Sequence, residues 1–154
     1  MANKPATKSD TLDFHSRIKL PYVWHVGKYG SRFYQEIRDH CRIWGTRCPK
    51  CGNVYVPPRD TCIHCYESIF EWVEVGTTGS LSCYTIVRYP QPEIQPVQPP
   101  FGLGIIQLDG ASTGLVHFIG QVDFNKIRIG MKVQAVFQKN RVGSYLDIAH
   151  FAPL

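Results

Sequence analysis

Two closely spaced cysteine pairs are the feature that most limits what this chain can fold into. Cys48 and Cys51 form the first pair, and after ten intervening residues Cys62 and Cys65 form the second. Thiolates at positions i and i+3 of a tight turn can share one ion, and two such pairs supply the four soft ligands of tetrahedral Zn²⁺. Four thiolates leave no open coordination position. The pattern therefore predicts a structural zinc site, with rubredoxin-like iron as the alternative occupant.

Disulfides and redox chemistry fit the cysteine pairs less well than a metal ion does. Structural disulfides need an oxidising compartment, and the opening residues MANKPA contain no apolar signal segment, so we expect a cytoplasmic protein. A redox-active C-x-x-C motif usually occurs once and opens a helix, whereas Gly52 and Pro57-Pro58 favour turns here. The remaining cysteines, Cys41 and Cys83, lie in apolar patterns and are predicted to be buried small hydrophobic side chains.

The segment before the first cysteine pair is predicted to be an irregular arm followed by a helix over residues 31–44. Apolar side chains recur on one face of that helix: Phe33, Ile37, Cys41 and Trp44. Ser31 is the expected N-cap, and Gly45 is the expected residue that ends the helix. The helix would then lead almost directly into the metal-binding turns.

The segment after the second cysteine pair is predicted to be β-structure. A strand is expected at residues 69–75, and five more are expected at 80–89, 101–108, 115–119, 131–138 and 144–151. A stiff Pro-rich loop at 90–100 and a short helical turn at 123–127 interrupt them. The number and order of the five strands favour an OB-fold barrel over a small sandwich.

The predicted fold is therefore mainly β: an N-terminal helical segment, a rubredoxin-like zinc ribbon and a five-stranded OB-fold barrel. We place the boundaries at residues 1–45, 46–75 and 76–154. Hydrophobic residues make up 44% of the chain, which is enough for a core. No apolar run approaches the ~20 residues of a membrane span, so no membrane association is expected.

The net charge of +5 is concentrated ahead of the cysteines. Residues 1–47 contain nine Lys and Arg against four Asp and Glu, whereas residues 76–154 contain six against four. A basic N-terminal segment suits an anionic partner such as a phosphate-bearing ligand or an acidic protein face. Plain solubility explains a surplus of this size equally well.

A self-sufficient active site is not apparent in the sequence. The chain has no G-x-S-x-G elbow between a strand and a helix, because its one such sequence, at residues 110–114, lies between two predicted strands. It has no H-E-x-x-H motif, and no glycine-rich phosphate loop opens a helix. The six histidines are scattered: His15, His25, His40, His64, His117 and His150. We expect His64 to face solvent and His117 and His150 to be core or surface residues of strands.

Several segments together resemble one known family: residues 31–37, 45–52, 57–59, 62–65, 72–79, 101–110 and 129–133. The chain is similar over roughly residues 20–153 to the acyl-CoA-associated proteins that join an N-terminal helical hairpin, a rubredoxin-like zinc ribbon and an OB-fold. Two C-x-x-C pairs alone are common among proteins, whereas their position between a helix and a barrel is specific to this family.

The resemblance implies a non-catalytic partner of a thiolase-fold or related acyl-CoA enzyme. Such a subunit binds the catalytic subunit and helps to form the acyl-CoA site. Within the family, the suggested similarity is to small subunits of thiolases that cleave an aryl β-ketoacyl-CoA. The expected partner is then a thiolase-fold catalytic subunit in a hetero-oligomer, and the expected ligand is a coenzyme A thioester.

Five residues before the cysteine pairs are candidates for contact with acyl-CoA or with the partner: Arg32, Tyr34, Arg38, Arg42 and Arg47. The arginines suit the phosphates of coenzyme A or acidic partner residues. Two rival functions remain. Zinc ribbons and OB barrels also bind single-stranded nucleic acid, but the barrel segment here has little basic surplus. A free-standing acyl-CoA carrier would bind coenzyme A without a partner.

Overall fold

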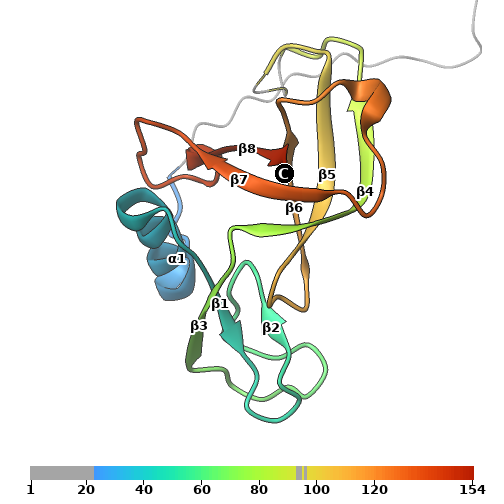
Figure 1. The fold of residues 1–154 in the computed structure, drawn as a ribbon. Coiled ribbons are helices and arrows are strands. Elements are labelled where there is room, and N and C mark those ends of the chain that lie inside the picture. The colour runs from blue at the N-terminus through green and yellow to red at the C-terminus, as the bar shows by residue number, and fades with distance from the viewer. Residues whose placement is uncertain (1–22, 93–94, 96) are drawn as a thin grey trace, which may run out of the picture.

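The computed structural model describes residues 23–92, 95 and 97–154, in which one α-helix is followed by a small sheet and a barrel (Figure 1). Helix α1 spans Gly27–His40. The small sheet is antiparallel, in the order β2-β1-β3, and its strands are β1 (Ile43–Arg47), β2 (Val54–Tyr55) and β3 (Glu71–Val75). The first cysteine pair lies between β1 and β2, and the second between β2 and β3.

Five strands form a closed barrel in the order β4-β5-β6-β8-β7, which confirms the predicted five-stranded barrel. The strands are β4 (Thr78–Val87), β5 (Phe101–Leu108), β6 (Gly114–Ile119), β7 (Lys132–Phe137) and β8 (Ile148–Pro153). Two 3₁₀ turns interrupt them, η1 (Phe124–Lys126) and η2 (Tyr145–Asp147). The barrel closes through its parallel pair, in which Ile119 of β6 lies opposite Phe151 of β8.

The helix prediction was wrong at both ends. Helix α1 begins at Gly27 rather than Ser31, and Cys41 ends it in a left-handed conformation with φ 55°. The Cys41 N–H donates to the Ile37 carbonyl at 3.2 Å. Trp44, predicted on the helix face, instead lies in β1 opposite Glu74 of β3. A side chain that suits a helix face also suits a strand, and β3 supplies the partner that decides between them. No helix in the described residues is long and apolar enough to cross a membrane.

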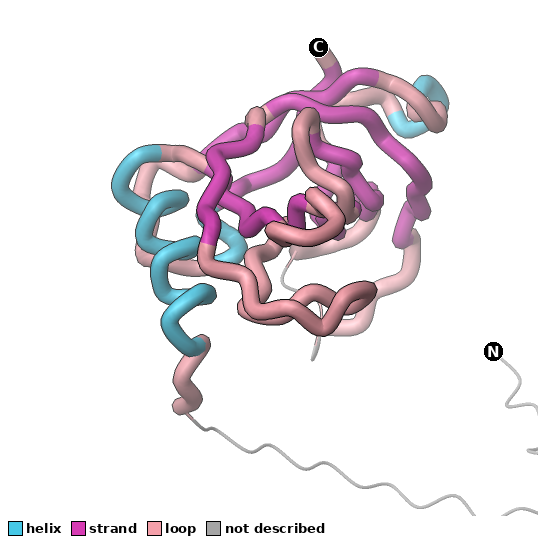
Figure 2. Tube along the Cα trace, turned by 90° about the horizontal axis from the view of Figure 1, so that it is seen from below, coloured by secondary structure: helices cyan, strands magenta, loops and turns pink. Residues whose placement is uncertain are grey.

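One apolar core connects the helix, the small sheet and the barrel. Phe33 and Ile37 of α1 pack in the same cluster as Ile43 of β1, Val75 of β3 and Leu81 of β4. Figure 2 shows α1 lying alongside the barrel strands. A second, separate cluster surrounds the cysteine pairs and consists of Cys48, Tyr55, Cys62 and Ile69. The tip of the ribbon therefore depends on a very small core of its own.

Contrary to the prediction, the two cysteines outside the pairs are not buried. Cys83 is exposed because the pairing of β4 with β5 shifts register between Leu81 and Cys83. This bulge changes which side of the strand faces the barrel interior, so Cys83 lies beside the exposed Ile105 instead of in the core. Cys41 is half-buried at the end of the helix.

The last strand and the Pro-rich loop also differ from expectation. The predicted strand at 144–151 begins with η2, and regular β8 pairing starts at Ile148. Within the loop, residues 93, 94 and 96 lie outside the described residues. The Gln95 N–H donates to the Gln91 carbonyl at 3.0 Å, a local backbone hydrogen bond that a fully extended loop would lack. The predicted N-terminal arm falls mostly on residues 1–22, outside the described residues.

Gly79 lies at a crowded backbone crossing in the barrel, and its substitution gives a direct test of the closed architecture. Gly79 pairs with both Leu108 and Val133. A Cβ at this position would lie 2.4 Å from the Gln107 carbonyl oxygen, a backbone atom that cannot move away. We expect Gly79→Ala to lower the free energy of unfolding by about 1–3 kcal/mol in urea titrations. Gly76→Ala is the matched control, because its Cβ would find its nearest atom at 3.6 Å. Equal losses in the two variants would contradict the crossing.

Candidate metal centre and partner surface

The four paired cysteines meet at one point. The Sγ atoms of Cys48, Cys51, Cys62 and Cys65 all lie within 4.8 Å of one another, and those of Cys51 and Cys62 are 3.7 Å apart. A tetrahedral site with Zn–S bonds of about 2.3 Å has sulfur–sulfur edges of about 3.8 Å. All six cysteines are free thiols. The donor set and spacing therefore fit one tetrahedral metal ion.

The two cysteine turns, which we call the first knuckle (residues 48–53) and the second knuckle (residues 62–67), are conformational copies of each other. In the first, Gly52 N–H donates to the Cys48 carbonyl and Cys48 N–H donates to the Asn53 carbonyl. In the second, Tyr66 N–H donates to the Cys62 carbonyl and Cys62 N–H to the Glu67 carbonyl. Gly52 and Tyr66 occupy the same place, with φ 74° and φ 57°. Only one of the two knuckles therefore uses the glycine that this conformation favours.

Tyr55 supports the metal site and was not singled out from the sequence. Its Oη lies 3.2 Å from Cys62 Sγ, and the Cys65 N–H donates to the same sulfur at 3.4 Å. Burial opposes ionisation of Cys62, but these hydrogen bonds outweigh it and lower the pKa of Cys62 to about 6. Contact with Cys51 and burial raise the pKa of Cys65 to about 12. Four adjacent thiols cannot all ionise without a metal, because their negative charges repel one another. A bound divalent cation offsets this repulsion and allows four thiolates side by side.

Three of the four candidate arginines form ion pairs within the chain. Arg42 and Arg47 approach glutamates of β3 across the β1–β3 pair, with N–O distances of 3.7 and 3.6 Å. Arg38 makes a two-point contact with Asp39 that holds the pKa of that carboxyl below its ordinary value. Three of the nine cationic side chains in residues 1–47 are therefore locally compensated.

Arg32 lies between two tryptophans. Its guanidinium carbon is 5.1 Å from the centre of the Trp44 ring and 4.3 Å from that of Trp72. Tyr29 stacks on Trp72 at a ring-centre distance of 5.3 Å. These contacts connect α1 to β1 and β3, so Arg32 has a structural role in this arrangement. A contact role for Arg32 with acyl-CoA or a partner stays a prediction.

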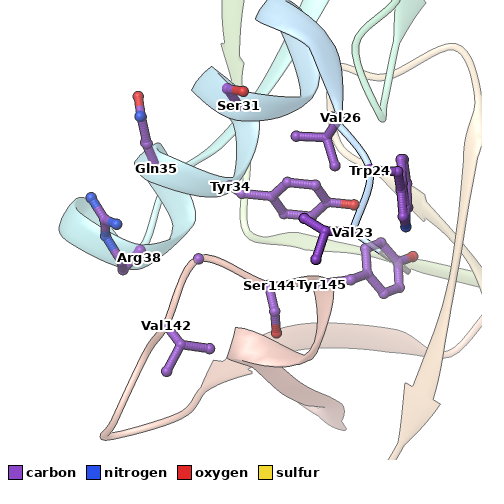
Figure 3. A pocket seen from close by; sticks show the side chains of 11 residues that line it. Val23, Trp24, Val26, Ser31, Tyr34, Gln35, Arg38, Val142, Ser144 and Tyr145 are labelled. Atoms are coloured by element: carbon purple, nitrogen blue, oxygen red, sulfur yellow. The ribbon is translucent and has the colours of Figure 1, made fainter. Parts of the chain in front are cut away.

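Tyr34 and Arg38 line a groove between α1 and the β7–β8 loop, which we call the helix groove (Figure 3). Its volume is about 570 Å³, and it is bounded on the opposite side by Val142 and Tyr145. Trp24, just before the helix, also lines it and is 66% exposed. The helix groove brings two of the predicted contact residues together, whereas Arg42 and Arg47 lie outside it.

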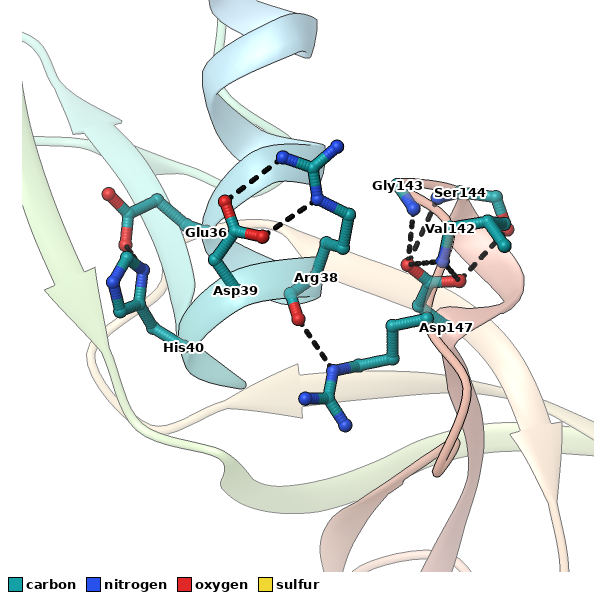
Figure 4. Close-up of polar contacts among 9 residues, drawn as sticks. Glu36, Arg38, Asp39, His40, Val142, Gly143, Ser144 and Asp147 are labelled. Atoms are coloured by element: carbon teal, nitrogen blue, oxygen red, sulfur yellow. Dashed lines mark hydrogen bonds and ion pairs between the residues drawn. The ribbon is translucent and has the colours of Figure 1, made fainter.

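A buried carboxylate shapes the loop wall of the helix groove (Figure 4). Asp147 is 2% exposed and accepts backbone hydrogen bonds from Val142, Gly143 and Ser144, at 2.7 to 3.2 Å. Burial opposes its ionisation, but the three N–H donors outweigh this and hold its pKa below the ordinary value. The S-x-x-D capping pattern of Ser144 and Asp147 is the sequence signal that could have located this loop.

The two histidines in described strands, His117 and His150, make contacts within the fold. His117 is buried, and its Nδ1 accepts the Phe118 N–H at 2.9 Å, so Nε2 carries the proton toward the Tyr145 carbonyl at 3.3 Å. Burial lowers the pKa of His117, which keeps it neutral. His150 packs against Gly120 and is half-buried. His64 is exposed, as predicted.

Comparison with known proteins identifies the family. A family model described as "ChsH2, rubredoxin-like zinc ribbon domain" matches residues 36–71, and one described as "ChsH2, C-terminal OB-fold domain" matches residues 72–138. A DUF35 domain-containing scaffold protein of Methanocaldococcus jannaschii is 30% identical over 112 residues, which are 70% of this chain and 76% of that protein. The chain belongs to the ChsH2/DUF35 family. The resemblance inferred from the sequence is thereby confirmed, with its zinc ribbon and OB-fold.

Other ChsH2/DUF35 relatives extend the comparison. A DUF35 domain-containing scaffold protein of Methanothermobacter thermautotrophicus is 27% identical over 111 residues, 71% of this chain and 82% of that protein. A probable enoyl-CoA hydratase alpha subunit of Thermomonospora curvata is 26% identical over 101 residues, 66% of this chain but 31% of that longer protein.

Two solved structures show the same fold. An Ltp2-ChsH2(DUF35) aldolase contains a chain that is 26% identical, with a TM-score of 0.60 over 80% of this chain and 93% of that one. A DUF35 family protein of unknown function from Sulfolobus solfataricus is also 26% identical, with a TM-score of 0.57 over 71% of this chain and 78% of that one.

Proposed function

We propose that this ChsH2/DUF35 protein is a non-catalytic accessory subunit of an enzyme complex that acts on acyl-CoA. The observation that carries the proposal is the family match, which runs through ribbon and barrel over residues 36–138. The similar proteins include two scaffold proteins and a probable enoyl-CoA hydratase subunit. They also include a chain of the Ltp2-ChsH2(DUF35) aldolase. We further propose that the catalytic partner has a thiolase fold and cleaves an aryl β-ketoacyl-CoA.

The chemistry of the described residues supports an accessory role. Cys48, Cys51, Cys62 and Cys65 would hold a structural zinc ion, because four thiolate ligands complete its coordination. His117 would make a poor general base, since both ring nitrogens already have backbone partners. The ion would hold the ribbon tip in shape.

We assign the helix groove as the surface where the partner or its acyl-CoA approaches this chain. It combines exposed apolar side chains, including Trp24 and Val142, with the hydroxyl of Tyr34 and the guanidinium of Arg38. This mixture suits a pantetheine arm or the apolar face of a catalytic subunit. A single-strand nucleic-acid site is less well supported, because Arg42 and Arg47 are paired with glutamates.

Reconstitution tests the proposed function. The thiolase-fold subunits encoded by the same organism would be produced with and without this chain and assayed for coenzyme A-dependent cleavage of aryl β-ketoacyl-CoA. We expect one of them to co-elute with the chain on size exclusion. Its activity should rise at least about tenfold when the chain is present, which corresponds to about 1.4 kcal/mol of transition-state stabilisation.

Two results would favour the rival functions. Failure of every subunit to co-elute, together with micromolar coenzyme A binding by the chain alone, would favour a free-standing carrier. Tight, salt-sensitive binding of an oligonucleotide, unaffected by coenzyme A, would favour a nucleic-acid-binding protein.

A further inference from the structure

The second knuckle carries a large side chain at a place where its backbone conformation favours glycine. Tyr66 has φ 57° and is 83% exposed, whereas the equivalent place in the first knuckle is Gly52. Residues with a Cβ adopt this left-handed conformation only at a cost. A strained residue that a glycine could replace indicates a role for its side chain, and this side chain is open to solvent.

Tyr66 lines a groove on the ribbon, which we call the knuckle groove. The groove has a volume of about 550 Å³ and lies between the second knuckle and the start of α1. Its apolar lining includes Ile63, which is 51% exposed, and Val26, which is 38% exposed. Tyr66 and Ile63 therefore form an exposed apolar surface that is not part of either core cluster.

The two walls of the knuckle groove are fixed before any partner arrives. The Tyr29 hydroxyl of α1 donates to the Ile69 carbonyl of the ribbon at 2.6 Å. On the ribbon side, the Thr46 hydroxyl donates to the Arg59 carbonyl at 2.8 Å and accepts the Arg59 N–H at 2.9 Å. Thr46 itself is fully buried. A preformed groove loses little conformational entropy on binding.

The net positive charge of the knuckle groove favours an occupant that carries a negative charge. Its lining contains the cations Lys28 and Arg59 against one carboxylate, Asp60. Among the described residues, no ion pair joins Lys28 or Arg59 to an acidic side chain. An apolar segment that also carries a carboxylate complements this surface, because its acid would face the two cations.

We infer that the knuckle groove docks an apolar, acid-bearing segment of the catalytic subunit, with Tyr66 as its main contact. The inference rests on the proposed function and specifies which surface of the chain makes the complex. Large aromatic side chains commonly dominate the energy of such contacts, and an interfacial role explains why tyrosine occupies the position that glycine would fill without strain.

The decisive variant is Tyr66→Gly, because it removes the contact and relieves the backbone. We expect its denaturation midpoint to be unchanged or higher, while its Kd for the catalytic subunit, measured by titration calorimetry on the zinc-loaded full chain, weakens at least about tenfold. Ile63→Ser should weaken the Kd in the same direction, and Lys28→Glu should weaken it more at low than at high salt. Tyr89→Ser is the matched control, because Tyr89 is a 65% exposed tyrosine outside the groove.

The outcomes separate this inference from the proposed function. If the wild-type chain binds no catalytic subunit, the proposed function fails. If the wild-type chain binds but Tyr66→Gly and Ile63→Ser keep its Kd within about twofold, the function stands and the knuckle-groove inference is wrong. It is also wrong if these variants change only the affinity for free coenzyme A, or if Tyr89→Ser weakens the complex equally. Should Tyr66→Gly prove unstable, Ile63→Ser and Lys28→Glu decide.

Discussion

Replacing Cys62 with serine is expected to remove stoichiometric metal and to unfold the ribbon tip. Cys62 is fully buried among the four sulfurs, and the cluster around it contains only Cys48, Tyr55 and Ile69 besides. Structural zinc supplies roughly 10–16 kcal/mol of apparent binding energy in small zinc-finger peptides, far more than four side chains can contribute. The apolar core that the barrel shares with the helix and the small sheet lies outside this cluster, so the barrel should persist. Metal analysis should therefore fall from about one ion per chain to near zero.

Limited proteolysis and a matched variant make this test specific. Cleavage should appear between residues 48 and 69 in Cys62→Ser, while the barrel remains protected. Cys83→Ser is the control, because Cys83 is an exposed thiol outside the cluster. It should keep the metal and the wild-type midpoint. A Cys62→Ser protein that retains one tightly held ion, or a Cys83→Ser protein that loses it, would contradict the four-cysteine site. The same metal analysis distinguishes zinc from iron.

Replacing Asp147 with asparagine is expected to cost about 2–4 kcal/mol of stability, because hydrogen bonds to a charged acceptor contribute about 1.5–3 kcal/mol each and do not add fully. The variant keeps the shape but places an NH₂ group against backbone donors from residues 142–144. The β7–β8 loop would lose the acceptor that orders it. Urea titration at neutral pH measures the loss, and Asp123→Asn is a control because Asp123 caps only the exposed turn η1.

The stability difference between the wild type and Asp147→Asn is expected to depend on pH. The pKa of Asp147 is lower in the folded protein than its ordinary value of 3.8. Its contribution is therefore fully present above about pH 4 and is lost as the pH falls through the lower folded pKa. We expect Asp147→Asn to approach wild-type stability as the pH falls below about 4. A gap between the two proteins that stays constant down to about pH 2 would show that ionisation of Asp147 is not involved.

Local patterns predicted the parts of this fold that depend on near neighbours in sequence. The cysteine spacing indicated one four-sulfur cluster, and the strand predicted from Phe101 to Leu108 matches the bounds of β5. Trp44 and Cys83 were misplaced for a common reason. Each fits its pattern in isolation, but the β1–β3 pairing and the bulge between Leu81 and Cys83 are decided by strands distant in sequence.

The candidate site was predictable to a similar extent. Tyr34 and Arg38 line one groove, and their contact with acyl-CoA or a partner stays a prediction. The pairing of Arg42 with Glu74 is a tertiary contact that charge counting along the chain could not reveal. The strain at Tyr66 appears only when the conformations of the two knuckles are compared, since a tyrosine in a turn carries no signal in the sequence itself.

The single apolar core shared by helix, small sheet and barrel has a consequence for assembly. Residues of all three contribute to it, so within the described part of the chain these elements move as one body. The helix groove and the knuckle groove both include Val26, just ahead of α1. Helix α1 lines both grooves, and the Tyr29–Ile69 hydrogen bond ties this helix to the ribbon, which sets the spacing between the grooves. A protein that engages both must match that spacing, so the fold selects its partner by dimension as well as by chemistry.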